Sequence, residues 1–262
     1  LGLLATAWMD GLQARPSVIA GEDNAAAGPT VLAQRLQVGY PTRGTRRGGA
    51  SRGGGCELPA GTSPLTALMP ADPNASAESL APESVISLTY RAVPELWFYM
   101  PYSLNASSQV DFVVKNVDDD TLLRAQLAPE GSNHTEPGLI QVSFADFELS
   151  LMPETGYHWY LTVRCDGGGV VSVDGWLQYQ SAEPVMNTTP DTAPESISIR
   201  AEFDVSQGFW VDGLTSLRQG LQNAPSPEQL QTTWQSLLAA EGLSDIVDQP
   251  VRDCCAFVTV QP

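Results

Sequence analysis

The chain has 262 residues, of which 42% are hydrophobic, so it is long enough to bury the core of one large domain, or of one domain with an appendage. It carries 30 acidic residues against 13 basic ones, and its formal net charge is −17. Because such a field repels nucleic acid and anionic lipid, we expect no nucleic-acid partner.

The first eight residues, Leu1–Trp8, form an apolar run, which Asp10 interrupts. We interpret residues 1–20 as a truncated signal peptide; a gene-fragment edge and a disordered leader are the alternatives. No later run approaches the ~18 apolar residues that a membrane-spanning helix needs. We therefore expect a periplasmic or secreted protein without a membrane span in the mature chain.

Residues 21–55 are rich in Gly, Ala and Arg and lack a periodic apolar pattern. This composition predicts a flexible leader, since it buries too little apolar surface to offset its ordering entropy. Its two Arg-Gly-Gly repeats, at Arg47 and Arg52, resemble those of RNA-binding segments but lack interleaved aromatics. A basic tether that touches the acidic body or an anionic envelope polymer is the favoured interpretation.

Residues 56–190 show short runs of alternating polarity, separated by Gly, Pro, Asn and Asp, which predict a β-sandwich domain. Strands are expected at Val85–Arg91, Leu96–Tyr102, Gln109–Val117, Leu122–Leu127, Leu139–Phe144, Tyr157–Cys165 and Val170–Tyr179. The glycine loop before Val170 is too short for a crossover, so the last two strands should form an antiparallel hairpin. The predicted fold is mainly β: an antiparallel sandwich, Ig-like or jelly-roll-like.

Residues 191–262 are expected to form a helical C-terminal subdomain with two or three packed helices, so the fold class is α+β. Apolar residues fall on one helical face at Trp210, Leu214, Leu217 and Leu221, and on another at Leu230, Trp234, Leu237 and Leu238. Ser226 is a candidate N-cap for the second helix, and Gly242 a stop. Both apolar stripes are too wide to remain in water, so we expect the helices to dock on the sandwich.

The cysteines are Cys56, Cys165, Cys254 and Cys255, with no C-x-x-C pair and only two histidines in the chain. A zinc site with ordinary spacing is therefore disfavoured, and disulfides are the better interpretation. All three connectivities remain open, but we favour Cys56 with Cys165 because that bond would tie the first core segment to a central strand. Cys254 and Cys255 would then pair together under strain, stay free or bond elsewhere.

The motifs with catalytic potential have structural explanations. Gly49–Gly53 matches G-x-S-x-G but lacks the flanking strand and helix, and His134 and His158 are interpreted as surface residues without a buried acidic partner. Asp118–Asp120 could offer oxygen ligands to calcium, but a solvated hairpin tip is favoured. We predict no catalytic residues, no metal and no cofactor; a pair of carboxylates acting as a hydrolase stays open.

Five aromatic residues of the predicted strands could form a platform for sugar rings: Trp97, Tyr99, Trp159, Tyr160 and Trp176. Core packing is the default explanation for most of them. If any are exposed, strand alternation favours Trp97, Tyr99 and Tyr160 as ligand-binding residues.

Several blocks resemble, in the same order, a cyanobacterial family known as domain of unknown function 928. They are Arg46–Gly55 leading into Cys56, Leu65–Pro70, Leu96–Tyr102, Gly156–Cys165, Gly175-Trp176 and Gly208–Leu214. Phe209-Trp210-Val211-Asp212 stands where Ile-Trp-Tyr-Asp is expected. The resemblance implies an extracytoplasmic cyanobacterial protein, and it carries over no catalytic residue.

The sequence thus favours a non-catalytic interaction or structural module of the cell envelope, with an envelope or secreted protein as partner. A polysaccharide-binding module using an aromatic sheet face is the first alternative, and a carboxylate-pair hydrolase is the second.

Overall fold

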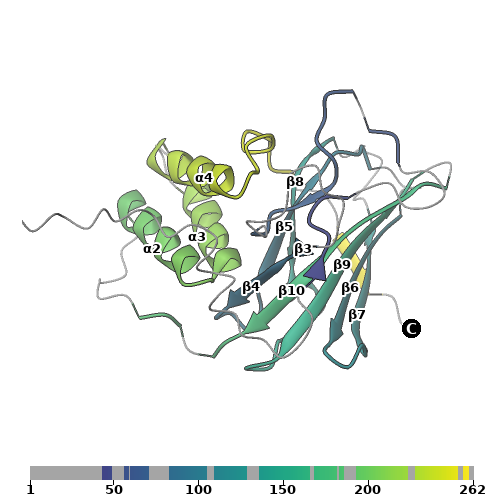
Figure 1. Ribbon diagram of the computed structural model, residues 1–262, viewed down its shortest axis with the longest axis horizontal. Coiled ribbons are helices and arrows are strands. Elements are labelled where there is room, and N and C mark those ends of the chain that lie inside the picture. The colour runs from purple at the N-terminus through teal and green to yellow at the C-terminus, as the bar shows by residue number, and fades with distance from the viewer. Residues whose placement is uncertain are drawn as a thin grey trace, which may run out of the picture.

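In the computed structural model, two β-sheets pack face to face and a group of helices lies beside them (Figure 1). The structure describes residues 43–48, 56–58, 60–70, 83–104, 109–128, 136–165, 168–181, 183–185, 193–223, 228–252 and 256–259. This architecture confirms the predicted α+β sandwich with a helical C-terminal part.

The larger sheet has six strands in the order β11-β7-β6-β9-β10-β4, and the smaller has three in the order β2-β5-β8. The strands of the larger sheet are β4 (Ile86–Thr89), β6 (Gln109–Asn116), β7 (Thr121–Ala128), β9 (Gly156–Arg164), β10 (Val170–Tyr179) and β11 (Ala256–Thr259). Those of the smaller sheet are β2 (Thr66–Ala67), β5 (Glu95–Met100) and β8 (Gly138–Ser143), followed by the 3-10 helix η1 (Phe144–Phe147). Two short strands, β1 (Arg43–Gly44) and β3 (Glu83–Ser84), pair with each other.

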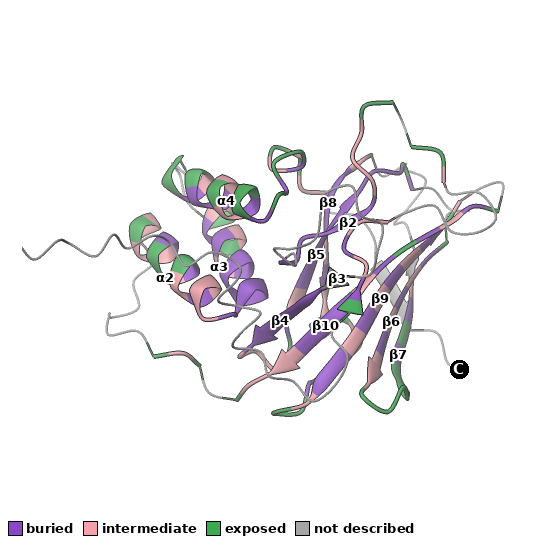
Figure 2. Ribbon diagram, in the orientation of Figure 1, coloured by how far each residue is buried: buried purple, intermediate pink, exposed green. Residues whose placement is uncertain are grey.

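The predicted hairpin is confirmed, since β9 and β10 pair antiparallel with Arg164 opposite Val170. Alternation along β9 puts Tyr157, Trp159 and Leu161 in the core and leaves the residues between them half-buried (Figure 2). One pair differs from the antiparallel prediction: β4 runs parallel to β10, with Trp176 opposite Ile86. A parallel pair between strands this far apart in the chain leaves no local sequence signal.

Edge-to-face aromatic contacts join the two sheets. Phe98 on β5 lies 5.5 Å from Trp159 and 6.4 Å from Phe112 on the larger sheet, measured between ring centroids. Phe112 in turn contacts Phe144 at 5.9 Å. Such pairs stabilise a core by about 0.5–1.5 kcal/mol beyond the area they bury.

Three helices follow the sheets: α2 (Pro194–Ser206), α3 (Trp210–Asn223) and α4 (Glu228–Ala240). The apolar spacing indicated α3 and α4 and missed α2, because the buried positions of α2 are Ser198, Ala201 and Asp204, which form no apolar stripe. α3 contacts both β4 and β5, so it docks the helical part on the sandwich.

The predicted stop of α4 is also confirmed. Gly242 has a φ of 67°, its amide donates to the Ala239 carbonyl at 3.0 Å, and the Leu243 amide donates to the Leu238 carbonyl at 2.9 Å. The proposed cap at Ser226 lies outside the described residues. Among the described helices, none is both long and apolar enough to cross a membrane.

Residues 43–48, which we name the N-terminal strap, correct the predicted leader. They belong to the fold: Thr45 exchanges two backbone hydrogen bonds with Asp174 on β10, each 3.0 Å long. The rest of the predicted leader, and the predicted signal peptide, lie outside the described residues.

Two arginines explain why the strap docks. The buried Arg46 guanidinium donates to the carbonyl oxygen of Glu241 at 2.6 Å, and Arg47 donates to that of Gly242 at 2.9 Å and holds both carboxylate oxygens of Asp245. Cations are favoured at the C-terminal end of a helix, where carbonyls lack partners. The bonds to Arg47 lower the pKa of Asp245 to about 2, so this contact should weaken only as the pH falls toward that value.

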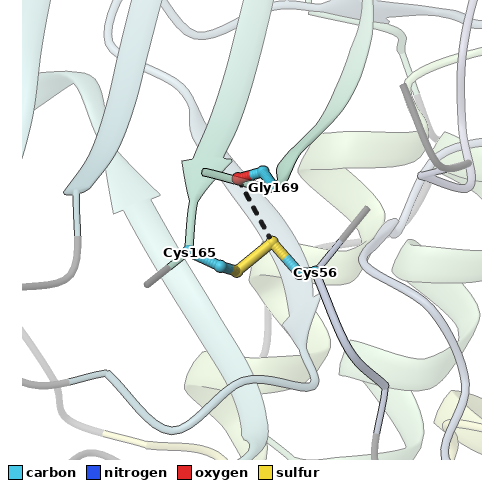
Figure 3. The surroundings of a disulfide bond; sticks show 3 residues. All are labelled: Cys56, Cys165 and Gly169. Carbon is cyan, nitrogen blue, oxygen red and sulfur yellow. Dashed lines mark hydrogen bonds between the residues drawn. A yellow bond between two sulfur atoms is a disulfide. The ribbon is translucent and has the colours of Figure 1, made fainter. Parts of the chain in front are cut away.

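The predicted disulfide is present between Cys56 and Cys165, with the two Cα atoms 5.6 Å apart (Figure 3). It fixes the segment before β2 to the end of β9. The sulfur of Cys56 lies 3.8 Å from the Gly169 carbonyl oxygen, a contact in which no proton is shared because a disulfide sulfur carries none. Cys254 and Cys255 lie outside the described residues.

Candidate functional site

Two of the three predicted ligand-binding aromatics are buried, which corrects the idea that they form an exposed sheet face. Trp97 is 4% exposed and Tyr99 is 2% exposed. Alternation does turn them away from the sandwich core, as predicted, but the helical part covers that second face of β5: Arg218 of α3 lies over Trp97. All of β5 beyond its first residue is therefore buried.

Tyr160, the third candidate, lies half-buried on the outer face of the larger sheet, where it is part of a hydrogen-bonded cluster. Its hydroxyl lies 2.7 Å from Nδ1 of His158, and Nε2 of His158 lies 2.8 Å from a carboxylate oxygen of Asp174. The rings of Tyr160 and His158 are 4.1 Å apart, and the Lys115 ammonium lies 5.9 Å from the Tyr160 ring. We name Tyr160, His158, Asp174 and Lys115 the sheet-face cluster.

The sheet register assembles this cluster. On β9 and β10, Tyr160 lies opposite Asp174 and His158 lies opposite Trp176, so His158 and Asp174 are diagonal neighbours on the same face. His158 thus has the acidic partner that the sequence interpretation denied it. That interpretation considered the alternation within β9 and not the pairing with β10.

Hydrogen bonding in the cluster orients its polar groups. If Nε2–H donates to Asp174, a neutral imidazole accepts at Nδ1 from the Tyr160 hydroxyl. Burial, followed by the charges of Asp174 and Asp119, raises the pKa of Tyr160 to about 12. The hydroxyl therefore keeps its proton near neutral pH and can donate and accept hydrogen bonds.

The strap covers one end of the cluster. His158 stacks on Trp176 with ring centroids 4.3 Å apart, and the Trp176 indole N–H donates to the Arg43 carbonyl at 3.3 Å. Trp176 is only 6% exposed. The half-buried surface available to a ligand is thus that of Tyr160 and His158, with Lys115 beside them.

Gly44→Ala should lift the strap from this face. A Cβ atom at Gly44 would collide with the backbone carbonyl of Asp174, which cannot rotate away. We expect a loss of about 1–3 kcal/mol in the free energy of unfolding, together with a red shift of tryptophan emission as Trp176 gains water. Denaturant titration and fluorescence measure both effects. Arg43→Ala is the control: its side chain is exposed and its carbonyl remains, so a comparable loss in that variant would refute this role of Gly44.

A second polar cluster lies where α2 and α3 meet the end of β4, and it contains two buried carboxylates. Asp212 accepts from the Thr89 hydroxyl and from the Tyr90 backbone amide, both at 3.1 Å. Its Oδ1 lies 3.2 Å from Nε of Arg91, close enough for an ion pair although that N–H is not aimed at it. Asp204 accepts from the Tyr90 hydroxyl at 3.1 Å and from Arg200 at 2.8 Å.

The raised pKa values of these two carboxylates are as the hydrolase alternative requires, but their accessibility is not. Burial raises the pKa of Asp212 to about 7 and also raises that of Asp204. Both side chains, however, are 0% exposed, and both carboxylates are occupied by protein donors. In this arrangement they join the helical part to the sandwich and offer no carboxylate to a substrate.

The aspartates considered for calcium lie in the exposed turn between β6 and β7. Asp119 pairs with Lys115 at 2.8 Å, and the Asn116 side-chain oxygen accepts from the amides of Asp118 and Asp120. Asp111 is paired with Arg164 instead. The described residues contain no group of three or more His, Cys, Asp or Glu that could hold a metal ion. His134 lies outside the described residues.

Fold and clusters together define a disulfide-linked β-sandwich with a docked helical tail and a polar, partly aromatic outer sheet face. Residues 47–251 match the family model Domain of Unknown Function (DUF928), which covers most of the chain. The chain therefore belongs to the DUF928 family. No curated protein matches it.

Proposed function

We propose that this chain is an extracytoplasmic, non-catalytic interaction module of a cyanobacterial cell envelope, which binds its partner through the sheet-face cluster. The observation that carries the proposal is the hydrogen-bonded Tyr160–His158–Asp174 arrangement. It lies on the face of the larger sheet turned away from the core, and it is only half-buried. Polar and aromatic side chains held rigidly at a surface are typical of binding sites.

The disulfide supports the extracytoplasmic placement, because such bonds persist in oxidising compartments and are rare where thiols are kept reduced. The family resemblance supports a cyanobacterial source. The acidic composition is compatible with a protein that stays soluble in a crowded envelope without binding nucleic acid.

The non-catalytic assignment rests on the state of the titratable groups. Tyr160 keeps its proton near neutral pH, and the buried carboxylates of Asp204 and Asp212 are engaged in structural bonds. Because both carboxylates are occupied by protein donors, these contacts argue against the hydrolase alternative.

Differential alkylation tests the placement. Free thiols of intact cells are blocked with one reagent, the protein is reduced, and the released thiols are labelled with a second. We expect peptides of Cys56 and Cys165 from the periplasmic or secreted fraction to carry the second label. The first label on both cysteines would contradict the placement.

Polysaccharide binding at the same face is the second candidate, and the half-exposed ring of Tyr160 favours it. An aromatic ring beside hydrogen-bonding groups and an ammonium suits a hydroxyl-rich ligand. Tyr160→Ala should reduce retention on purified envelope polysaccharide about tenfold, the equivalent of about 1.4 kcal/mol, whereas Tyr160→Phe keeps the ring and should retain most of it. Equal retention of all three proteins would exclude a sugar site at this ring.

A further inference from the structure

Arg218 on α3 is a half-buried cation without a polar partner. Its guanidinium carbon lies 5.6 Å from the ring of Trp97 on β5 and 5.3 Å from the ring of Trp234 on α4, so two tryptophans flank it. Within the described part of the chain it forms neither a hydrogen bond nor an ion pair, and its Nε is buried without an acceptor. Burial lowers the pKa of this guanidinium.

This situation is unusual for an arginine in so acidic a protein. The other buried or half-buried arginines with described contacts reach oxygen atoms: Arg46, Arg47, Arg91, Arg200 and Arg252. With 30 acidic residues in the chain, a carboxylate for Arg218 could readily have been present. The cation–π contacts offset part of its desolvation, but they leave its donors unused.

Further unpartnered polar atoms lie in the same layer. The indole N–H of Trp97 is buried without an acceptor, and the residue is 4% exposed. The terminal nitrogens of Arg218 have no protein partner either. Unlike Nε, they are not fully buried, so they reach solvent. The guanidinium of Arg218 thus packs against the rings of Trp97 and Trp234 and keeps unused donors that reach solvent.

We propose that Arg218 is a carboxylate-binding site for an acidic side chain of a protein partner. A planar carboxylate can accept two parallel N–H bonds from a guanidinium, a geometry that neutral acceptors cannot match. A monoanionic carboxylate matches the single charge of the guanidinium, whereas a dianion such as phosphate would leave a second negative charge in the field of a protein whose net charge is −17. An arginine packed against two tryptophan rings loses little side-chain freedom on binding, as anchors of protein interfaces do.

This site is separate from the sheet-face cluster, because it lies on α3 and β5, on the side of the smaller sheet. If one of the two binding proposals is refuted by experiment, the other is therefore not refuted with it.

The test is an NMR titration of the full, isotope-labelled chain with N-acetylglutamate amide, which carries one free carboxylate. The cross-peaks observed are the Nε–H of Arg218, assigned by its loss in Arg218→Lys, and the indole N–H of Trp97. We expect a saturable shift of both peaks, and affinity about tenfold weaker at the Trp97 peak in Arg218→Lys, which keeps the charge and the packed stem but loses the fork.

Three ligands complete the design. N-acetylglutamine amide is neutral and of the same size, so equal shifts would overturn the proposal. Sodium chloride controls for ionic strength. If it reproduces the shifts seen with N-acetylglutamate amide, the proposal is likewise overturned. Saturation by glucuronate without saturation by N-acetylglutamate amide would overturn the protein-partner assignment and indicate an acidic sugar.

Discussion

Replacing both Cys56 and Cys165 by alanine is expected to lower the free energy of unfolding by about 4 kcal/mol. The bond joins residues 109 positions apart, and in the loop-entropy model a closed loop of about 100 residues restricts the unfolded chain by about 4.7 kcal/mol. A denaturant titration under oxidising conditions measures the loss. Such a change is a large fraction of the total stability of a typical domain.

Reductant supplies the matched control. Wild-type protein in excess reductant should unfold at nearly the same denaturant concentration as the double variant. The double variant lacks this bond, so reductant cannot destabilise it by breaking the bond. Equal midpoints for oxidised wild type and the double variant would show that the bond between β9 and the segment before β2 contributes nothing to stability.

Asp212→Ala is expected to destabilise the protein by about 2–4 kcal/mol, since a buried donor left without its acceptor costs about 1–3 kcal/mol. It would leave the Tyr90 amide and the Thr89 hydroxyl without this acceptor at the junction between α3 and β4. Because Asp212 joins the helical part to the sandwich, α3 should lose protection first. Hydrogen exchange followed residue by residue checks this, and faster exchange confined to the larger sheet would contradict it.

The pH dependence at Asp212 separates its charge from its hydrogen bonds. A folded-state pKa of about 7 lies above the ordinary value of 3.8, so the protonated carboxyl favours the folded state. This contribution is fully present below the unfolded pKa and is lost as the pH rises through the folded one. From about pH 5 to about pH 8, the wild type should therefore lose about 3 kcal/mol relative to Asp212→Asn.

Asp118→Asn, in the exposed turn after β6, is the control for the loss of one charge. If wild type and Asp212→Asn keep a constant difference in stability across this pH range, Asp212 does not ionise near neutrality in the folded protein.

The sequence predicted the longer strands between β4 and β10 well because each carries its own signal. It did not predict the two-residue strands β1, β2 and β3, or β11, which lies in the range expected to be helical. In β9, apolar residues at every second position are sufficient to define a strand with one buried face, and the glycines after it define the hairpin. The same holds for α3 and α4, whose apolar stripes repeat at helical spacing. α2 lacks such a stripe, so the spacing of its apolar residues did not predict a helix.

Contacts between distant segments could not be predicted in this way. Arg46 binds the end of α4, 195 positions away, and nothing in the composition of the predicted leader indicates a partner there. Trp97 lies on the face of β5 that alternation assigns to the surface, and Arg218 of the docked helix α3 covers its ring. His158 and Asp174 lie 16 positions apart and meet because of the β9–β10 register.

The outer face of the larger sheet is proposed to contact a partner in the envelope. Site-specific photo-cross-linking tests it most directly, with a photoreactive residue in place of Thr162, beside the sheet-face cluster on β9, and in a second protein in place of the exposed Glu202 on α2. In native envelopes, we predict one reproducible adduct from position 162 that weakens when Tyr160→Ala is added, and no such adduct from position 202. Absence of any adduct from position 162, or the same adducts from both positions, would show that this face is not the partner-binding surface.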